Sequence, residues 1–283
     1  MPARHCGSES AGETAGKFMG YARHVRNPCA LPVTQARAAP GGSPDTQADF
    51  QTLIDFYLLP GLDGTGKLFD AFIEHAPAWA NPIRVSYASA NENSYDYLVG
   101  YVTSKIDPAR DHVILGESFS GPIAIRVAFQ SGGSLLGLVL SATFISSPPL
   151  LGRIPIPNAL LEAVVENSPQ RFLAEHFLLN GNPSPALLAE VVAVTQSLSS
   201  KVVAERITAT RNVALDKEIA ALHCPLLYLR ATRDRVVPSS AGDEVKSANQ
   251  HASIVDIDSP HMILQCNSRD AWAAVSRVFA QYR

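Results

Sequence analysis

The chain has 283 residues, of which 46% are hydrophobic and 17% charged, so it can form one large α/β core or a core with an insertion. Its net charge of −3 comes without a basic block, which argues against nucleic acid as a partner. No run reaches the roughly 18 apolar residues of a membrane span, so none is expected. The cysteines, at positions 6, 29, 224 and 266, have no C-x-x-C or zinc-site spacing. We therefore predict no metal and a reducing compartment.

The N-terminal residues 1–48 differ from the rest, because they mix Arg, His, Gly, Ser, Pro and Ala without apolar periodicity. The apolar core of a secretory signal, roughly 7–15 residues long, is missing. We predict a disordered extension and a cytoplasmic location. An organelle transit segment, or sequence upstream of the true start, are the alternatives. The folded domain should begin near Phe50.

From Phe50 onward, short apolar runs alternate with helical patterns, which is typical of a mostly parallel sheet. Strands are predicted at Leu53–Leu58, Ile83–Tyr87, His112–Leu115, Gly137–Ser141, Pro225–Leu229 and Ser253–Ile257. Helices are predicted at Lys67–His75, Tyr95–Lys105, Gly121–Gln130, Ser240–Asn249 and Ser268–Gln281. These patterns predict an α/β fold with about six strands, whose core comprises residues 49–143 and 216–283.

A glycine-rich loop follows the first predicted strand and has the sequence LLPGLDGTG over residues 58–66. Read on to Lys67, it matches the first seven positions of the phosphate-binding pattern GxxxxGK[ST]. Leu68 stands at the eighth position, so the hydroxyl that would bind magnesium is absent. An NTPase with Asp256 as the metal-binding acid is thus an alternative that explains only this segment.

A serine stands on a short turn after the third predicted strand, in the sequence GESFSG of residues 116–121. A serine between a strand and a helix is the arrangement called a nucleophile elbow. The turn exposes the Ser118 hydroxyl and directs the first helical N–H groups toward the place where an acyl oxyanion would form. The usual pattern has glycine at the fifth position, where this chain has Ser120. Ser120 has Ser118 two places before it and Pro122 two places after it, where the motif has glycines, and it is the weaker nucleophile. A turn without chemistry is the plain alternative.

The segment from residue 144 to 215 interrupts the alternation of strands and helices. Two apolar stripes and two longer helical patterns occur there, namely Leu160, Leu161, Val164 and Val165; Phe172, Leu173, His176 and Phe177; Ala186–Leu198; and Val202–Arg211. We predict a helical lid that helps to line an apolar acyl pocket. For most of these side chains, packing of the lid onto the core is the role that we expect.

A serine hydroxyl needs a base, because it is a weak nucleophile at neutral pH. His261 follows the last predicted strand and precedes the C-terminal helix, so it is the predicted base. The histidines at positions 75, 112 and 223 are expected to be bystanders. Asp234, after the fifth predicted strand, is the predicted acid that orients the imidazole. Asp256 and Asp258 lie close before His261 and are the competing acids.

The oxyanion of an acyl-transfer reaction normally needs two backbone N–H groups. Phe119, directly after the nucleophile, is predicted to supply one. Leu62 is predicted to supply the other, because it follows Gly61 in the tight loop. Asp63 would then lie close to the substrate carbonyl, and we expect it to cap the helix beginning near Lys67 or to bond to the turn backbone.

The loop LLPGLDGTG, the turn GESFSGP, Asp234 and His261 together resemble the α/β-hydrolase superfamily. The PGLDGTG loop is similar to bacterial members and to the catalytic part of plant phytyl-ester synthase-like acyltransferases. The resemblance covers about residues 50–283. It implies a Ser-His-Asp triad in the order Ser118, Asp234, His261, and acyl chemistry. The six predicted strands make a reduced version of the eight-stranded hydrolase sheet, in which the first two, antiparallel, strands are absent. Pro60 stands where a histidine is commoner, which bears on specificity more than on fold.

We therefore predict a serine hydrolase that cleaves carboxylic ester or thioester bonds through an acyl-enzyme on Ser118, without a cofactor. Its partner would be a small-molecule substrate with an apolar acyl group. Resolution of the same acyl-enzyme by an alcohol would make the protein an acyltransferase. A non-catalytic ligand-binding protein on the same fold is the third reading. The sequence does not predict an oligomeric state.

Overall fold

The structure is a computed structural model, and it describes residues 53–148, 156–180 and 183–282. The predicted N-terminal extension and the predicted start at Phe50 lie outside these residues. So does most of the stiff entrance to the predicted lid, residues 149–155.

Parallel strands form a six-stranded sheet in the order β2-β1-β3-β4-β5-β6. Their bounds are Ile54–Leu59 (β1), Ala80–Arg84 (β2), His112–Glu117 (β3), Leu135–Ser141 (β4), Leu226–Ala231 (β5) and Ser253–Ile257 (β6). The adjacent inner strands β1 and β3 are buried along their whole length. Continuous apolar runs of this kind are typical of strands covered on both faces. The predicted parallel sheet of about six strands is confirmed.

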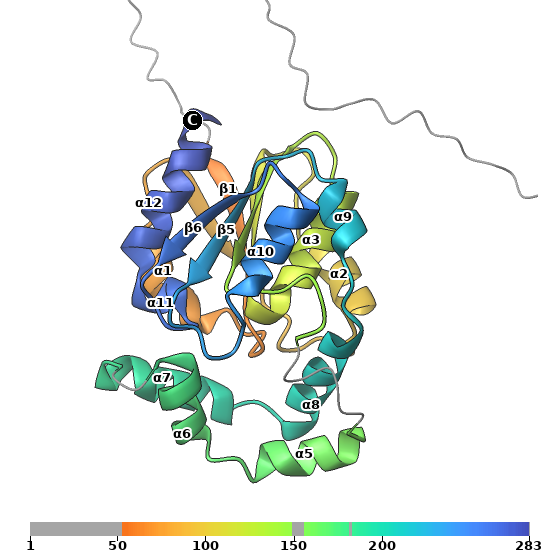
Figure 1. Cartoon of the computed structure of the whole chain (residues 1–283), viewed down its shortest axis with the longest axis vertical. Coiled ribbons are helices and arrows are strands. Elements are labelled where there is room, and N and C mark those ends of the chain that lie inside the picture. The colour runs from red at the N-terminus through yellow and green to blue at the C-terminus, as the bar shows by residue number, and fades with distance from the viewer. Residues whose placement is uncertain (1–52, 149–155, 181–182, 283) are drawn as a thin grey trace, which may run out of the picture.

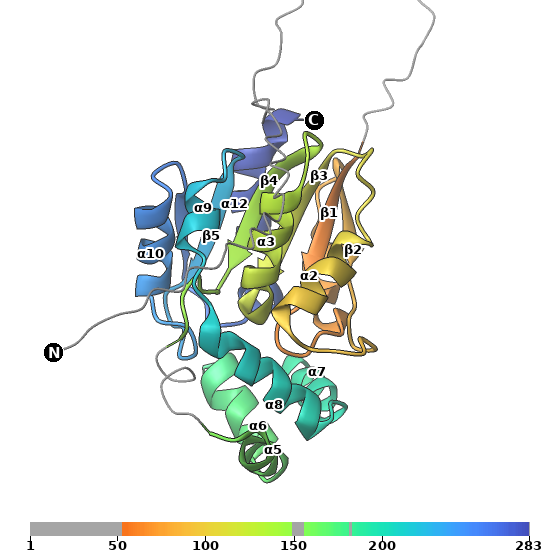
Figure 2. The same cartoon turned by 90° about the vertical axis from the view of Figure 1, so that its right-hand side faces the viewer.

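Helices cover both faces of the sheet (Figures 1 and 2). One face carries α1 (Asp70–Glu74), α11 (Ile263–Cys266) and α12 (Ser268–Phe279), and the other carries α2 (Tyr95–Thr103), α3 (Gly121–Gln130), α9 (Asp216–Ala220) and α10 (Ser240–Ala248). Each face has its own buried apolar cluster. On the α12 face, Trp272 stacks on Phe72 with ring centroids 4.4 Å apart. Because the sheet is packed between these two clusters, the carboxyl ends of its strands are held in fixed positions.

The second strand lies three residues earlier than its predicted range Ile83–Tyr87. The apolar alternation of residues 83, 85 and 87 continues past the strand, because Val85 and Tyr87 leave the sheet and enter the buried core. The strand itself holds Pro82, which an edge strand tolerates because one side of its backbone has no partner. The short helices α9 and α11 were not predicted, since neither is long enough to show a period.

A helical insertion lies at the end of the core where the strands terminate (Figure 2). Its described elements are α5 (Asn158–Glu166), α6 (Gln170–Leu173), a π-helical turn (Ala174–Leu178), α7 (Pro185–Gln196) and α8 (Ser200–Ala209). Leu179, Leu188 and Val191 of the insertion form a buried cluster with Met262 of the core. The domain limits predicted at residues 144 and 215, and the role of a lid, stay predictions.

Among the described residues, no single helix is long and apolar enough to cross a membrane. Helix α7 and residues 200–212 pass such a test only as a pair, with a bend of 92° between them.

Candidate active site

Ser118 lies on the turn between β3 and α3, and its backbone has a φ of 49°. Residues other than glycine seldom adopt this conformation, and such strained positions cluster at functional sites. Gly116 and Gly121 are required because there is no room for a side chain at either position. A Cβ at Gly116 would lie 2.6 Å from the Cβ of Ala124, and one at Gly121 would lie 1.9 Å from Thr143 Oγ1. Strand and helix therefore approach closely enough to hold the serine on a sharp turn.

A chain of hydrogen bonds connects the three predicted triad residues. His261 Nε2 is 2.9 Å from Ser118 Oγ, and His261 Nδ1 is 2.8 Å from Asp234 Oδ2. The N–H groups of Val236 and Val237 donate to Asp234 Oδ1 at 2.7 and 3.0 Å, which orients the carboxylate. The side chains of His261 and Asp234 are only 6% and 5% exposed, so water competes little for these bonds. The structure thus brings together the residues chosen from their order in the chain, at distances that allow proton transfer.

The competing acids are engaged elsewhere. Asp256 accepts from Arg230 Nε at 2.6 Å, and Asp258 accepts from Arg233 Nε at 2.7 Å. Both carboxylates are largely exposed, and neither contacts the imidazole of His261. Asp234 is therefore the acid that the geometry favours.

The glycine-rich loop lies against the nucleophile. A Cβ at Gly61 would lie 3.8 Å from the Cβ of Ser118, and Leu62 and Phe119 line the same cavity as Ser118. In the part of the chain that the structure describes, the Leu62 N–H donates to no other protein atom. An N–H without a protein acceptor beside the nucleophile is what an oxyanion hole requires. The assignment of Leu62 and Phe119 as its two donors stays a prediction.

Asp63 stabilises the turn of this loop and does not cap the following helix. Its Oδ1 accepts from the backbone N–H of Thr65 at 2.8 Å and from the Thr65 hydroxyl, whereas the helical turn after Gly66 has no side-chain cap. Burial raises the pKa of the Asp63 carboxyl, against the hydrogen bonds from Thr65 and the positive charge of Arg206. A buried carboxylate here would repel a phosphate, which weakens the NTPase reading of the loop.

Ser120, at the fifth position of the elbow motif, ties the elbow to the glycine-rich loop. Its side chain is fully buried and donates to the Pro60 carbonyl. The Tyr87 hydroxyl donates to the same carbonyl at 2.6 Å and also contacts Ser120 Oγ. The departure from glycine therefore has a structural use, and the Ser120 hydroxyl is engaged away from the cavity. The sequence analysis did not predict a role for Tyr87. The serine at position 120, where glycine is usual, was the only sign that a hydrogen-bond partner lies nearby.

Glu117, directly before the nucleophile, is a second residue that sequence reasoning missed. Its side chain is buried and lines the cavity, and Gln265 Nε2 donates to its Oε2 at 3.3 Å. Burial raises the pKa of Glu117 to about 7, against the hydrogen bond from Gln265 and the charge of His261. Burial lowers the pKa of His261, but the charge and hydrogen bond of Asp234 and the charge of Glu117 outweigh it, so this pKa lies above its ordinary value. The charges of Glu117 and His261 therefore affect each other's pKa.

Replacing Glu117 by glutamine should change two pH profiles. Removing a negative charge lowers the pKa of His261, so the acid limb of kcat/KM should move to lower pH. The Glu117 pKa rises from 4.5 in the unfolded chain to about 7 in the fold, so its contribution to stability is lost as pH rises between these values. Between pH 4.5 and 7, the wild type should lose on the order of 3 kcal/mol more unfolding free energy than Glu117→Gln.

Urea unfolding and kcat/KM profiles of Glu117→Gln measure both effects. Glu74→Gln, at an exposed position on α1, is the matched control and should leave both profiles unchanged. Identical profiles for wild type and Glu117→Gln would contradict the placement of this carboxyl.

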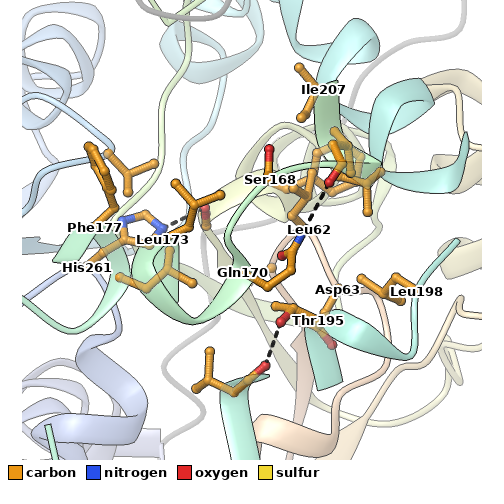
Figure 3. A pocket seen from close by; sticks show the side chains of 18 of the residues that line it. Leu62, Asp63, Ser168, Gln170, Leu173, Phe177, Thr195, Leu198, Ile207 and His261 are labelled. Carbon is orange, nitrogen blue, oxygen red and sulfur yellow. Dashed lines mark hydrogen bonds between the residues drawn. The ribbon is translucent and has the colours of Figure 1, made fainter. Parts of the chain in front are cut away.

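The cavity beside the triad has a volume of about 1000 Å³ and is bounded by the core and the helical insertion. The core residues that line it include Gly61, Leu62, Ser118, Phe119 and His261. The insertion contributes mainly apolar side chains, among them Leu161, Val165, Leu173, Phe177, Val191 and Ile207. In Figure 3, Leu173 and Phe177 lie on the same side as His261, and Ile207 and Leu198 lie on the opposite side. The predicted apolar pocket next to the nucleophile thus exists in the structure.

Within residues 53–148, 156–180 and 183–282, no group of three His, Cys, Asp or Glu side chains could hold a metal ion.

No protein-family model matches the sequence, and no curated protein matches it. Solved structures do match. The enol-lactonase from Burkholderia xenovorans LB400 has a TM-score of 0.69 at 16% identity, over 81% of this chain and 92% of that one. MenH from S. aureus has a TM-score of 0.66 at 13% identity, over 83% and 96%. The esterase EaEST from Exiguobacterium antarcticum has a TM-score of 0.64 at 14% identity, over 82% and 92%.

These neighbours are α/β-hydrolase fold proteins, and their likeness covers most of this chain and nearly all of theirs. The resemblance of the PGLDGTG loop to plant phytyl-ester synthase-like acyltransferases is not tested by them. The parallel six-stranded sheet, the helices on both of its faces and the matches to solved structures show that this chain has the α/β-hydrolase fold.

Proposed function

We propose that the protein is a serine hydrolase that cleaves carboxylic ester or thioester bonds of substrates with an apolar acyl group. The observation that carries this proposal is the hydrogen-bonded chain Ser118, His261 and Asp234, of which Ser118 and His261 line an apolar cavity. Titratable groups in such a geometry, beside a large pocket, are a recognised sign of a catalytic site. The hydrolase and esterase names among the structural neighbours agree with this reading.

The reaction follows from the geometry. Ser118 Oγ attacks the acyl carbonyl while His261 Nε2 takes its proton, and Asp234 holds the Nδ1–H of the imidazolium. The Leu62 and Phe119 N–H groups stabilise the oxyanion. Collapse of the tetrahedral intermediate breaks the bond to the leaving alcohol or thiol, which receives the proton from His261. Water then attacks the acyl-enzyme by the same route, so that the acid is released and Ser118 is restored.

The cavity supports an apolar acyl group in particular. Its volume of about 1000 Å³ lies at the upper end of the range for small-molecule sites. Burial of each additional methylene contributes about 0.8 kcal/mol, equivalent to roughly a fourfold rise in kcat/KM when the gain appears in the transition state. An acetyl group would leave most of this apolar wall in contact with water.

The proposal predicts a rising dependence of kcat/KM on acyl length. A series of p-nitrophenyl esters from acetate to decanoate should show kcat/KM increasing by about fourfold per methylene until the cavity is filled. N-acetylcysteamine thioesters of the same acyl groups test whether the protein also hydrolyses thioesters. A flat series, or hydrolysis of acetate alone, would contradict the apolar acyl group.

Leu173→Trp should shorten the accepted chain, because Leu173 lines the cavity from α6. We expect kcat/KM for the decanoate to fall by about tenfold or more, with acetate changed by less than about twofold. Phe172→Trp is the matched control, since Phe172 is the neighbouring residue but is 49% exposed. If Leu173→Trp and Phe172→Trp lower kcat/KM for the decanoate equally, the part of the cavity that Leu173 lines is not the acyl site.

A further inference from the structure

A buried arginine of the helical insertion is hydrogen-bonded to the glycine-rich loop of residues 60–66, which we call the catalytic loop. Arg206 lies on α8, and its side chain is fully buried, which is rare for an arginine. A guanidinium removed from water is destabilising unless its N–H groups are hydrogen-bonded. The partners of Arg206 therefore indicate what its burial achieves.

Those partners belong to segments around the active site. Nη1 donates to the Leu62 carbonyl at 2.8 Å, Nη2 donates to the Tyr87 carbonyl at 3.2 Å, and Nε donates to Asn93 Oδ1 at 2.9 Å. The guanidinium also stacks over the Tyr87 ring, 5.2 Å from its centroid. Tyr87 in turn holds the Pro60 carbonyl. One side chain thus reaches the loop 60–66 directly at Leu62 and indirectly at Pro60.

The loop is shaped to receive this guanidinium. Gly64 has a φ of 67°, and a Cβ there would lie 2.4 Å from Arg206 Nη1. Any side chain at position 64 would be strained and would displace the arginine. Asn93 also donates to Glu205 Oε2 at 2.8 Å, so the same core residue holds two neighbouring residues of α8.

The charge of Arg206 also acts on Asp63. Asp63 lies in the loop next to Leu62, and its buried carboxylate would oppose an oxyanion formed close by. The positive charge of Arg206 lowers the pKa of Asp63 against the effect of burial. A neutral side chain at position 206 would remove this charge together with the hydrogen bonds.

We propose that Arg206 is a positioning residue that holds the loop 60–66 so that the Leu62 N–H meets the oxyanion, which makes the insertion part of the catalytic apparatus. This inference rests on the proposed function. Arg206 does not line the cavity and would act on the transition state through the loop, without touching the substrate. It should therefore affect kcat and transition-state analogues more than KM.

The test compares Arg206→Met and Arg206→Lys with wild type. The readouts are kcat and KM for p-nitrophenyl octanoate and the affinity for octylboronic acid, whose tetrahedral adduct on a serine places an oxygen where the oxyanion would lie. Removal of one oxyanion donor lowers kcat by about 10²–10³-fold, and we expect Arg206→Met to approach that loss with KM changed by less than about threefold. Boronate affinity should fall in parallel. Arg206→Lys keeps the charge but not the planar set of donors, so its loss should be at least about tenfold.

Arg211→Met is the matched control. Arg211 also donates from the insertion to a backbone carbonyl, that of Ile156 at 2.9 Å, but not to the catalytic loop, and its kcat should stay within about twofold of wild type. Urea unfolding of each variant measures stability separately, and Arg206→Lys supplies the answer if Arg206→Met does not fold. A folded Arg206→Lys with unchanged kcat and boronate affinity would overturn the proposal. Wild type that neither hydrolyses the ester nor binds the boronate would instead reject the proposed function, and this role with it.

Discussion

Ser118→Ala should lower kcat/KM for p-nitrophenyl octanoate by about 10⁵-fold or more. The variant loses the hydroxyl that lies 2.9 Å from His261 Nε2, so no acyl-enzyme can form on residue 118. Residual turnover would come from the oxyanion hole and from binding alone. The unfolding free energy should change by less than about 1 kcal/mol, because the substitution removes one oxygen and leaves the glycine-flanked turn intact.

Ser131→Ala provides a matched control for this substitution. Ser131 caps the far end of α3 and its hydroxyl donates to the Val127 carbonyl at 2.8 Å, well away from the triad. Its kcat/KM should stay within about twofold of wild type. Ser118→Ala with more than about 1% of wild-type activity would mean that another residue is the nucleophile.

Asp234→Asn should lower kcat/KM by about 10⁴-fold while leaving the fold intact. An asparagine in this place can present its amide N–H₂ to His261 Nδ1, which favours the tautomer that carries its proton on Nε2 and cannot accept from Ser118. The Val236 and Val237 N–H groups hold one carboxylate oxygen and should hold the amide oxygen in the same place. Asn at position 234 thus disturbs the proton relay more than the loop.

Asp258→Asn is the informative comparison, because Asp258 lies closer to His261 in the sequence. It is exposed and paired with Arg233, so its kcat/KM should change by less than about twofold. Inactive Asp258→Asn together with active Asp234→Asn would show that the wrong carboxylate has been assigned.

The parts of the site that the sequence predicted are those that depend on local pattern and on chain order. Ser118 could be located because a strand, a glycine-flanked turn and a helix follow one another within a short segment. Asp234 and His261 could be located because the loops after parallel strands meet at one edge of the sheet. The hydrogen bonds between the three residues, at 2.8 and 2.9 Å, agree with that reasoning.

The contacts that the sequence did not predict join segments that are distant in the chain. Arg206 meets Leu62 across 144 positions, and Gln265 meets Glu117 across 148. No periodicity or motif encodes such pairs in a single sequence. The bounds of β2 were missed for a different reason, because the alternation that suggested a strand belongs partly to residues buried outside the sheet.

One of the two departures from the usual hydrolase motifs, the serine at position 120, is explained by the fold. Pro60 replaces the commoner loop histidine, and its carbonyl accepts from both Ser120 and Tyr87. Ser120 replaces the fifth-position glycine and supplies one of these donors. The loop is held by its carbonyl groups at Pro60 and Leu62, and the Leu62 N–H has no acceptor among residues 53–148, 156–180 and 183–282.

Labelling with a fluorophosphonate, read by intact mass, shows whether Ser118 is an activated nucleophile. This reagent forms a covalent adduct only with a serine that a neighbouring base activates. We expect one adduct on wild type, none on Ser118→Ala, and strongly slowed labelling of Asp234→Asn. An adduct that persists in Ser118→Ala, or no adduct on folded wild type, would contradict the assignment of Ser118 as an activated nucleophile.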